Sequence, residues 1–171
     1  YDTRSTGLPT IDATLNMTGL DAQYTDIDAV LKQTKLVAHM HSDTQQKDLM
    51  HLKADLQTPD LSVKKGDSIQ AHLSAPKLAA TMQYNSQDTT TLPTIDATLD
   101  FANMDGTFSD ITTSLRQSKL TAGIRSEKNK KDEPQIKASL ASAALKVMMG
   151  ETVKAKTQTI SMDAKAHYNP K

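Results

Sequence analysis

Apolar and polar residues alternate along most of this chain. Ile11, Ala13, Leu15 and Met17, for example, are each separated by one polar residue. A period of two is typical of a β-strand with one dry face and one wet face. Seven such segments occur in the first half of the chain and seven in the second. They cover residues 11–17, 27–31, 36–40, 50–56, 61–63, 69–73 and 78–84, and then 95–101, 111–115, 120–124, 136–140, 145–147, 153–155 and 160–168.

The second half of the chain repeats the first. Residues 8–15 return letter for letter at residues 92–99. We call the shift that carries position 8 to position 92 the repeat offset. An ungapped match of this kind predicts a tandem structural unit. We therefore expect a first β-repeat unit at residues 1–84, a linker at 85–91 and a second unit at 92–171, within one continuous repeat array.

The number of strands in each unit has a topological consequence. In a simple antiparallel meander with seven strands per unit, the second unit would begin in the direction opposite to the first. Either one connection crosses over, or the strand count is off by one. We place the crossover in the polar stretch 85–91, which at about 3.3 Å per residue is long enough to run back along a strand. The expected fold is all-β, with two tandem seven-strand units forming a long curved antiparallel sheet or a sandwich-like groove.

The apolar face of the predicted strands is the candidate site. It is rich in Leu, Ile, Ala and Met, and aromatic residues make up only 4% of the chain. This face is either a packed core or an open surface that holds acyl chains, and the pattern alone leaves both interpretations open. The repeat also predicts that Ile11, Leu15, Ile95 and Leu99 are buried. The candidate positions are Ile11, Leu15, Leu36, Met40, Leu52, Leu56, Ile95, Leu99, Leu120, Ile124, Ile136 and Leu140.

Composition limits both the interior and the partners. Only 37% of the chain is hydrophobic, so the interior is expected to be thin. The 20 basic and 20 acidic residues cancel, so charge favours neither a nucleic acid nor an anionic bilayer as a partner. The chain has no cysteine, which excludes disulfides, thiolate metal sites and a cysteine nucleophile.

The sequence contains no obvious targeting or anchoring segment. No stretch approaches the roughly 20 apolar residues that span a bilayer, and the first residue is Tyr1 rather than Met. We therefore expect a piece of a longer polypeptide whose targeting or anchoring segment lies outside the given sequence.

Three segments of the first unit resemble a known family. Residues 8–15, 18–27 and 31–36 are similar to the repeated strands of AsmA-like proteins of Gram-negative bacteria, and the resemblance extends over both units. It implies a periplasmic β-sheet groove in a protein that an N-terminal helix tethers to the inner membrane. It also implies a role in outer-membrane assembly, with phospholipid as the cargo moved between membranes. The family has no catalytic motif to carry over, only the apolar strand positions.

The sequence gives little support for an enzymatic activity. No P-loop, dinucleotide fingerprint, HExxH or GxSxG motif occurs, so we expect a protein that is not an enzyme and needs no cofactor. Asp12 and Asp26 recur as Asp96 and Asp110, and we interpret them as residues of strand surfaces and turns rather than as paired catalytic carboxylates.

The best metal candidate is a group of three histidines. If residues 36–41 and 49–56 form a hairpin with Met40 opposite Met50, His39 faces His51 and His41 lies diagonal to it on the wet face. We interpret this group as part of a solvated sheet face and predict no metal. The alternative to lipid transfer is a structural or adhesive β-repeat module that binds protein or glycan.

Overall fold

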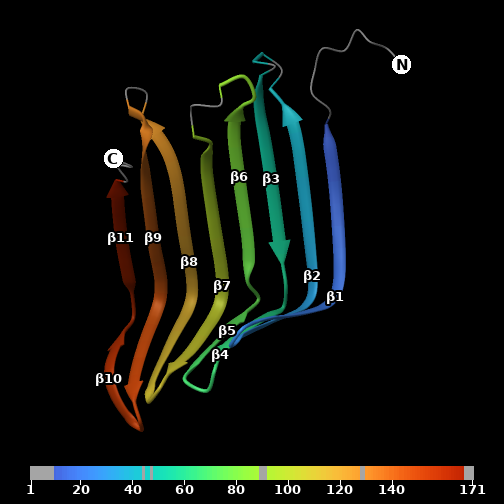
Figure 1. Ribbon diagram of the computed structural model, residues 1–171. Helices are drawn as coiled ribbons and strands as arrows, with labels where there is room; N and C mark the ends of the chain where they lie inside the picture. Colours follow the sequence, from blue (N-terminus) through green and yellow to red (C-terminus); the bar gives the residue numbers. More distant parts are fainter. Residues whose placement is uncertain (1–9, 44, 47, 89–91, 128–129, 168–171) are drawn as a thin grey trace.

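The described residues of the protein form one antiparallel sheet of eleven strands, which confirms the all-β class (Figure 1). The computed structural model describes residues 10–43, 45–46, 48–88, 92–127 and 130–167. The strands are β1 (Ile11–Tyr24), β2 (Ile27–Ser42), β3 (Leu49–Gln57), β4 (Asp60–Lys65), β5 (Ile69–Ser74), β6 (Lys77–Asn85), β7 (Thr94–Phe108), β8 (Ile111–Glu127), β9 (Lys130–Met149), β10 (Thr152–Thr157) and β11 (Ile160–His167). Among the described residues, no helix is long and apolar enough to cross a membrane.

The eleven strands make up eight long strands that follow one another across the sheet. β3 and β4 pair with the two halves of β2, and β6 and β5 pair with the two halves of β7. In the same way β11 and β10 pair with successive parts of β9. Each of these couples therefore acts as one long strand with a short break, and every long strand pairs with the next in sequence.

The expected number of fourteen strands is wrong, because three pairs of predicted segments are each one strand. Segments 27–31 and 36–40 are both parts of β2, segments 111–115 and 120–124 of β8, and segments 136–140 and 145–147 of β9. The residues between them interrupt the alternation without ending the backbone pairing. At Gln33 and Gln117 the backbone instead turns left-handed, with φ of 47° at both.

The expected crossover at residues 85–91 is also wrong. β6 and β7 pair directly as antiparallel neighbours, with Gln83 opposite Thr94. Each half of the chain contributes four long strands, an even number, so the second half begins in the same direction as the first without any crossover. Residues 89–91 themselves lie outside the described part of the chain.

The repeat-like strand architecture extends to the turns. Gly66 and Gly150, which the repeat offset relates, both have positive φ, 54° and 57°. The amide of Gly66 donates to the carbonyl oxygen of Asp26 and that of Gly150 to the carbonyl oxygen of Asp110, each at 2.9 Å. Glycine is favoured at both positions because residues with a Cβ rarely adopt this left-handed conformation.

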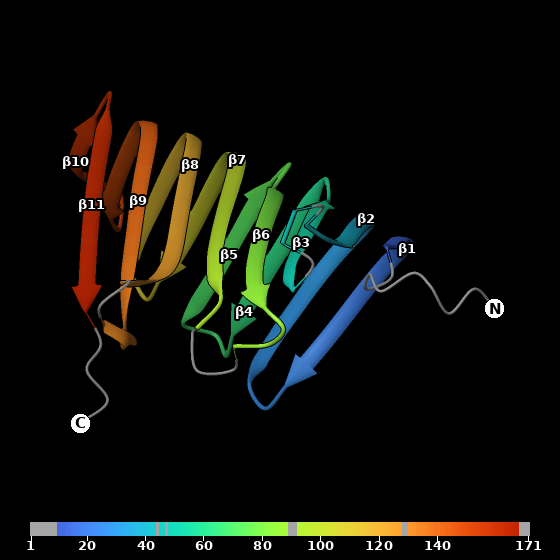
Figure 2. The same ribbon diagram turned by 90° about the horizontal axis from the view of Figure 1, so that it is seen from above.

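The long strands share a bend, so the sheet has two legs that meet at a crease (Figure 2). β3, β6 and β11 belong to the upper leg, and β4, β5 and β10 to the lower leg (Figure 1). On β2, Thr34 is buried at the bend, whereas its neighbours Lys32, Gln33 and Lys35 are exposed. Because the side chains on the inside of a bend crowd together and those outside spread apart, Thr34 marks the inner side of the crease.

Hydroxyl groups occupy the inner side of the crease. Thr34, Thr58, Ser118 and Ser142 are all buried. The Ser118 hydroxyl donates to the Ser142 hydroxyl at 2.8 Å. The hydroxyls of Thr58, Ser118 and Ser142 supply hydrogen bonds where the strands break or bend, whereas the Thr34 hydroxyl has no hydrogen-bond partner among the described residues.

The buried apolar core is as thin as the composition predicts. Among the described residues it consists of Met50, Phe101 and Leu115. The prediction that Ile11 and Leu15 are buried is wrong, since they are 47% and 50% exposed. Both lie on β1, which among the described residues pairs only with β2, so no described strand flanks them at the outer edge.

Candidate functional site

The twelve predicted apolar positions fall on two rows that cross the sheet. We call the first the leucine ladder, because seven of its eight members are leucine. Consecutive members stand directly opposite each other on neighbouring strands: Leu15, Leu36, Leu56, Leu78, Leu99, Leu120, Leu140 and Met162.

The second row lies four residues along each strand from the first. We call it the isoleucine ladder, and it contains the other six predicted positions. Its members are Ile11, Met40, Leu52, Met82, Ile95, Ile124, Ile136 and Ala166. Met82 of this row and Leu78 of the leucine ladder, both on β6, join the positions from the first half of the chain to those from the second.

Between the two ladders runs a row composed only of alanine, which we call the alanine track. Its members are Ala13, Ala38, Ala54, Ala80, Ala97, Ala122, Ala138 and Ala164. Rows on one face are two residues apart, so the two ladders lie about 13 Å apart, and seven strand spacings give the track a length of about 34 Å. A methyl-lined strip of this shape lies lower than the branched side chains on either side of it.

This apolar face is open to solvent. None of the twelve positions is fully buried: Ile95 and Leu99, which were predicted to be buried, are half-buried. Leu78 and Leu120, near the middle of the leucine ladder, are 38% and 39% exposed. Among the described residues no second layer covers the sheet, because all strands belong to one sheet and no helix is present. The closed-sandwich interpretation therefore does not describe this arrangement.

The lower leg carries a further apolar row on the inner side of the crease. Its best-covered member is Leu115, which is buried, and it stands opposite Met104 and Leu145. The whole row is Leu20, Leu31, Leu61, Leu73, Met104, Leu115, Leu145 and Thr157. Phe101, on the ladder side of the bend, is also buried. The apolar side chains of the two legs thus meet at the crease.

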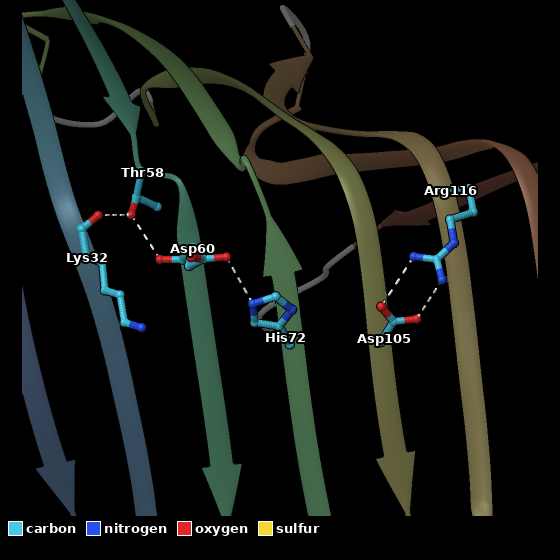
Figure 3. A network of polar contacts seen from close by, with 6 residues as sticks. All are labelled: Lys32, Thr58, Asp60, His72, Asp105 and Arg116. Atoms are coloured by element: carbon cyan, nitrogen blue, oxygen red, sulfur yellow. Dashed lines mark hydrogen bonds and ion pairs between the residues drawn. The ribbon is translucent and has the colours of Figure 1, made fainter.

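The opposite face of the sheet is polar and holds ion pairs. Asp105 accepts two hydrogen bonds from the Arg116 guanidinium at 3.2 Å (Figure 3). It also accepts one from the Ser114 hydroxyl at 2.7 Å. The Ser114 hydroxyl and then Arg116 hold the pKa of the Asp105 carboxyl below its usual range. His72 lies 3.0 Å from Asp60 on the neighbouring strands (Figure 3). These contacts keep charge on the face turned away from the ladders.

A hollow also lies on the polar face. It has a volume of about 750 Å³ and lies over β7, β8, β9 and β11. Its lining includes the Asp96–Arg125 ion pair, in which the guanidinium lies 3.1 Å from the carboxylate, together with Lys137 and Lys165. Charged side chains therefore contribute to its lining, together with Ala97, Ala122, Ala138 and Ala164, which also belong to the alanine track.

The three histidines do not adopt the predicted arrangement, because the β2–β3 register differs by two residues. Met40 stands opposite Leu52 rather than Met50, so His41 and not His39 faces His51. The His41 and His51 rings are stacked with centroids 5.2 Å apart. His39 instead contacts Asp12. Within the described residues, no three metal-ligating side chains lie close enough to hold an ion.

The repeated aspartates lie at strand surfaces and turns. Asp12 and Asp96 are exposed on the polar face and contact His39 and Arg125. Asp26 and Asp110 contribute their carbonyl oxygens to the two glycine turns. The carboxylates of Asp12 and Asp96 lie on different long strands separated by several others, so they do not form a pair.

Sequence reasoning missed Phe101 and Met50 of the core, and it missed the alanine track. The signal for the track is present in the sequence. Seven of the eight long strands carry a large apolar residue, then Ala two positions on, then another large apolar residue two further on, as in Ile11, Ala13 and Leu15. Aligning these triplets across the chain gives the register of the upper leg.

Comparison with known proteins finds no matching family model, no matching curated protein and no matching solved structure.

Proposed function

We propose that the alanine track and its two ladders hold the acyl chains of a phospholipid. In this proposal the protein is an AsmA-like β-groove fragment of the periplasm, tethered to the inner membrane in a longer polypeptide and acting in outer-membrane assembly or lipid transfer. The observation that carries the proposal is the continuous apolar face, which crosses all eight long strands and stays uncovered over the described residues.

The chemistry of the face suits an extended hydrocarbon. Soluble proteins rarely expose contiguous apolar patches of more than a few hundred Å² unless the patch binds something. A strip of alanine methyls between two taller rows gives a chain of CH₂ groups contacts from below and from both sides. Each CH₂ group removed from water contributes about 0.8 kcal/mol to binding.

The charge distribution suits a ligand recognised by its tails. The formal net charge of the chain is zero, and the ion pairs described above lie on the polar face. Binding that depends on burial of hydrocarbon is expected to change little with salt, whereas attraction to an anionic headgroup would be screened.

The test compares two substitutions on β6 that add the same charge to opposite faces. Leu78→Glu places a carboxylate in the leucine ladder, where the residue is already 38% exposed, so we expect the variant to fold. Thr81→Glu places one at an exposed position on the polar face, opposite Lys53. We expect Leu78→Glu to reduce binding of a fluorescent phospholipid at least tenfold, and Thr81→Glu to leave the affinity unchanged, with both variants folded by circular dichroism.

Equal loss in both variants, or no loss in either, would contradict a site on the apolar face. Wild-type protein that never binds the phospholipid would instead favour the rival function, a structural or adhesive module for protein or glycan. The charged hollow beside Asp96 and Arg125 is the feature that favours this rival.

A further inference from the structure

The sheet has two open edges. The repeat offset relates the strands at these edges to strands that pair with each other inside the same molecule. Over the described residues β1 pairs only with β2, while β10 and β11 pair only with β9, so β1 and β10/β11 are the edges (Figures 1 and 2). The repeat offset carries β1 onto β7, and it carries β5 and β6 onto β10 and β11. In the interior of the sheet, β5 and β6 pair with β7.

We propose that the β10/β11 edge of one chain pairs with the β1 edge of a second copy, in the register that β5/β6 uses with β7. The pairing of β5 and β6 with β7, which we call the internal junction, gives this register directly. Leu78 stands opposite Leu99, and Ala80 opposite Ala97. The corresponding contacts between copies join Met162 to Leu15 and Ala164 to Ala13, so that the leucine ladder and the alanine track continue from one molecule to the next.

The charges of the two edges are complementary in this register. The internal pair Thr81 and Asp96 becomes Lys165 of one copy opposite Asp12 of the next. In the lower leg, the internal pair His72 and Asp105 becomes Lys156 opposite Asp21. Opposite charges directly across a strand pair stabilise the pairing, and all four of these residues are exposed in the single chain.

One irregularity limits the extent of the junction. β10 shifts its register against β9 between Val153 and Ala155. The first residues of β10, before this shift, therefore do not follow the pattern of β5, and we restrict the junction to Ala155–Thr157 and β11. Lys156 and Lys165 both lie within this part.

The proposed association is head to tail. Its two surfaces are different, so each copy that joins leaves one β1 edge and one β10/β11 edge free at the ends, and growth is open rather than closed. A symmetric dimer through two β1 edges would lack this complementarity, because the charged residues of β1, Asp12 and Asp21, are both acidic. This inference concerns the sheet edges and does not depend on lipid binding.

Charge reversal tests the complementarity of the edges. We expect sedimentation velocity to show concentration-dependent association of the wild-type chain. Asp12→Lys with Asp21→Lys, and separately Lys156→Glu with Lys165→Glu, should each weaken it by roughly tenfold through like-charge contacts. A chain that carries all four reversals restores opposite charges and should recover the association. A wild-type chain that stays monomeric at millimolar concentration would overturn the proposal, as would failure of the combined variant to recover.

Disulfide trapping tests the register, and the absence of native cysteine makes it specific. Thr14 and Asp163 correspond to the opposed internal residues Thr98 and Ala79. A mixture of Thr14→Cys and Asp163→Cys chains should form a cross-linked dimer on mild oxidation. The control mixture of Thr14→Cys and Lys156→Cys should not, because the stretch of strand between positions 156 and 163 is about 23 Å long. Cross-linking of Thr14→Cys chains to each other, or equal yields in both mixtures, would overturn the head-to-tail register.

Discussion

Thr58 and Ser142 make the same contacts at positions that the repeat offset relates. The Thr58 hydroxyl lies 2.5 Å from the carbonyl oxygen of Lys32 and 2.9 Å from that of Asp60 (Figure 3). The Ser142 hydroxyl lies 3.1 Å from the carbonyl oxygen of Arg116 and 2.9 Å from that of Ala144. Both side chains are buried at the crease, so each one stabilises the bend between two legs of an otherwise continuous sheet.

Removing this hydroxyl should destabilise the protein. Thr58→Val keeps the shape of the side chain but leaves the carbonyl oxygens of Lys32 and Asp60 without this donor. We expect the free energy of unfolding to fall by about 1 to 2 kcal/mol in urea denaturation. Thr81→Val, at an exposed position on β6, should change it by less than about 0.5 kcal/mol. Equal effects of the two substitutions would show that the crease contact does not stabilise the bend.

Of the two phenylalanines, both on β7, Phe101 should contribute more to the stability of the fold. Its side chain is 6% exposed at the crease, whereas that of Phe108 is 60% exposed. Phe101→Ala should lower the free energy of unfolding by about 3 kcal/mol, and Phe108→Ala by less than about 1 kcal/mol. The order of the two melting temperatures checks this, and the reverse order would place the apolar core elsewhere.

The glycine turns have room for a side chain, but their left-handed backbone conformation disfavours one. A Cβ at Gly150 would meet no atom within 4 Å, yet the residue has φ of 57°. Gly150→Ala should therefore cost about 1 kcal/mol of unfolding free energy through the left-handed conformation alone. Gly19→Ala is the control, because Gly19 does not have positive φ and a Cβ there makes only an ordinary contact at 3.9 Å with the Leu31 carbonyl. A drop in stability for Gly19→Ala but not for Gly150→Ala would contradict this assignment.

Asp105 should make stability depend on pH in the acid range. Its pKa is lowered in the folded protein by the Ser114 hydroxyl and then by Arg116, so the unfolded chain binds the proton more tightly. This contribution is present in full above the unfolded pKa of about 3.9 and is lost as the pH falls through the lower folded pKa. The stability difference between wild type and Asp105→Asn should shrink over that interval. A difference that grows as the pH falls would contradict the sign of this shift.

The strands of the fold were predictable because their alternation survives in the sequence. Ile11, Ala13 and Leu15 identify β1, and the equivalent triplets identify most other strands. The length of β2 was not predictable in the same way. The left-handed backbone at Gln33 leaves two successive residues, Lys32 and Gln33, on the exposed side of the bend. Such an interruption looks like a loop in a period-two pattern, which is why the strand count and the crossover were wrong.

The apolar face was predictable, but its exposure was not. Leu36 and Leu56 were assigned to one apolar face, and they do stand opposite each other. Whether that face is covered depends on a second layer, which the alternation of one sheet does not specify. The β2–β3 register was also wrong, because it was anchored on Met40 and Met50 rather than on the alanines Ala38 and Ala54, which stand opposite each other.

Native mass spectrometry of the protein purified from cells in a mild detergent tests the central claim most directly. If the open apolar face holds acyl chains, the wild-type spectrum should contain a population heavier than the 18.6 kDa chain by the mass of a phospholipid. That population should be lost in Leu78→Glu and retained in Thr81→Glu. A wild-type chain that carries no lipid, even after incubation with phospholipid vesicles, would contradict the claim.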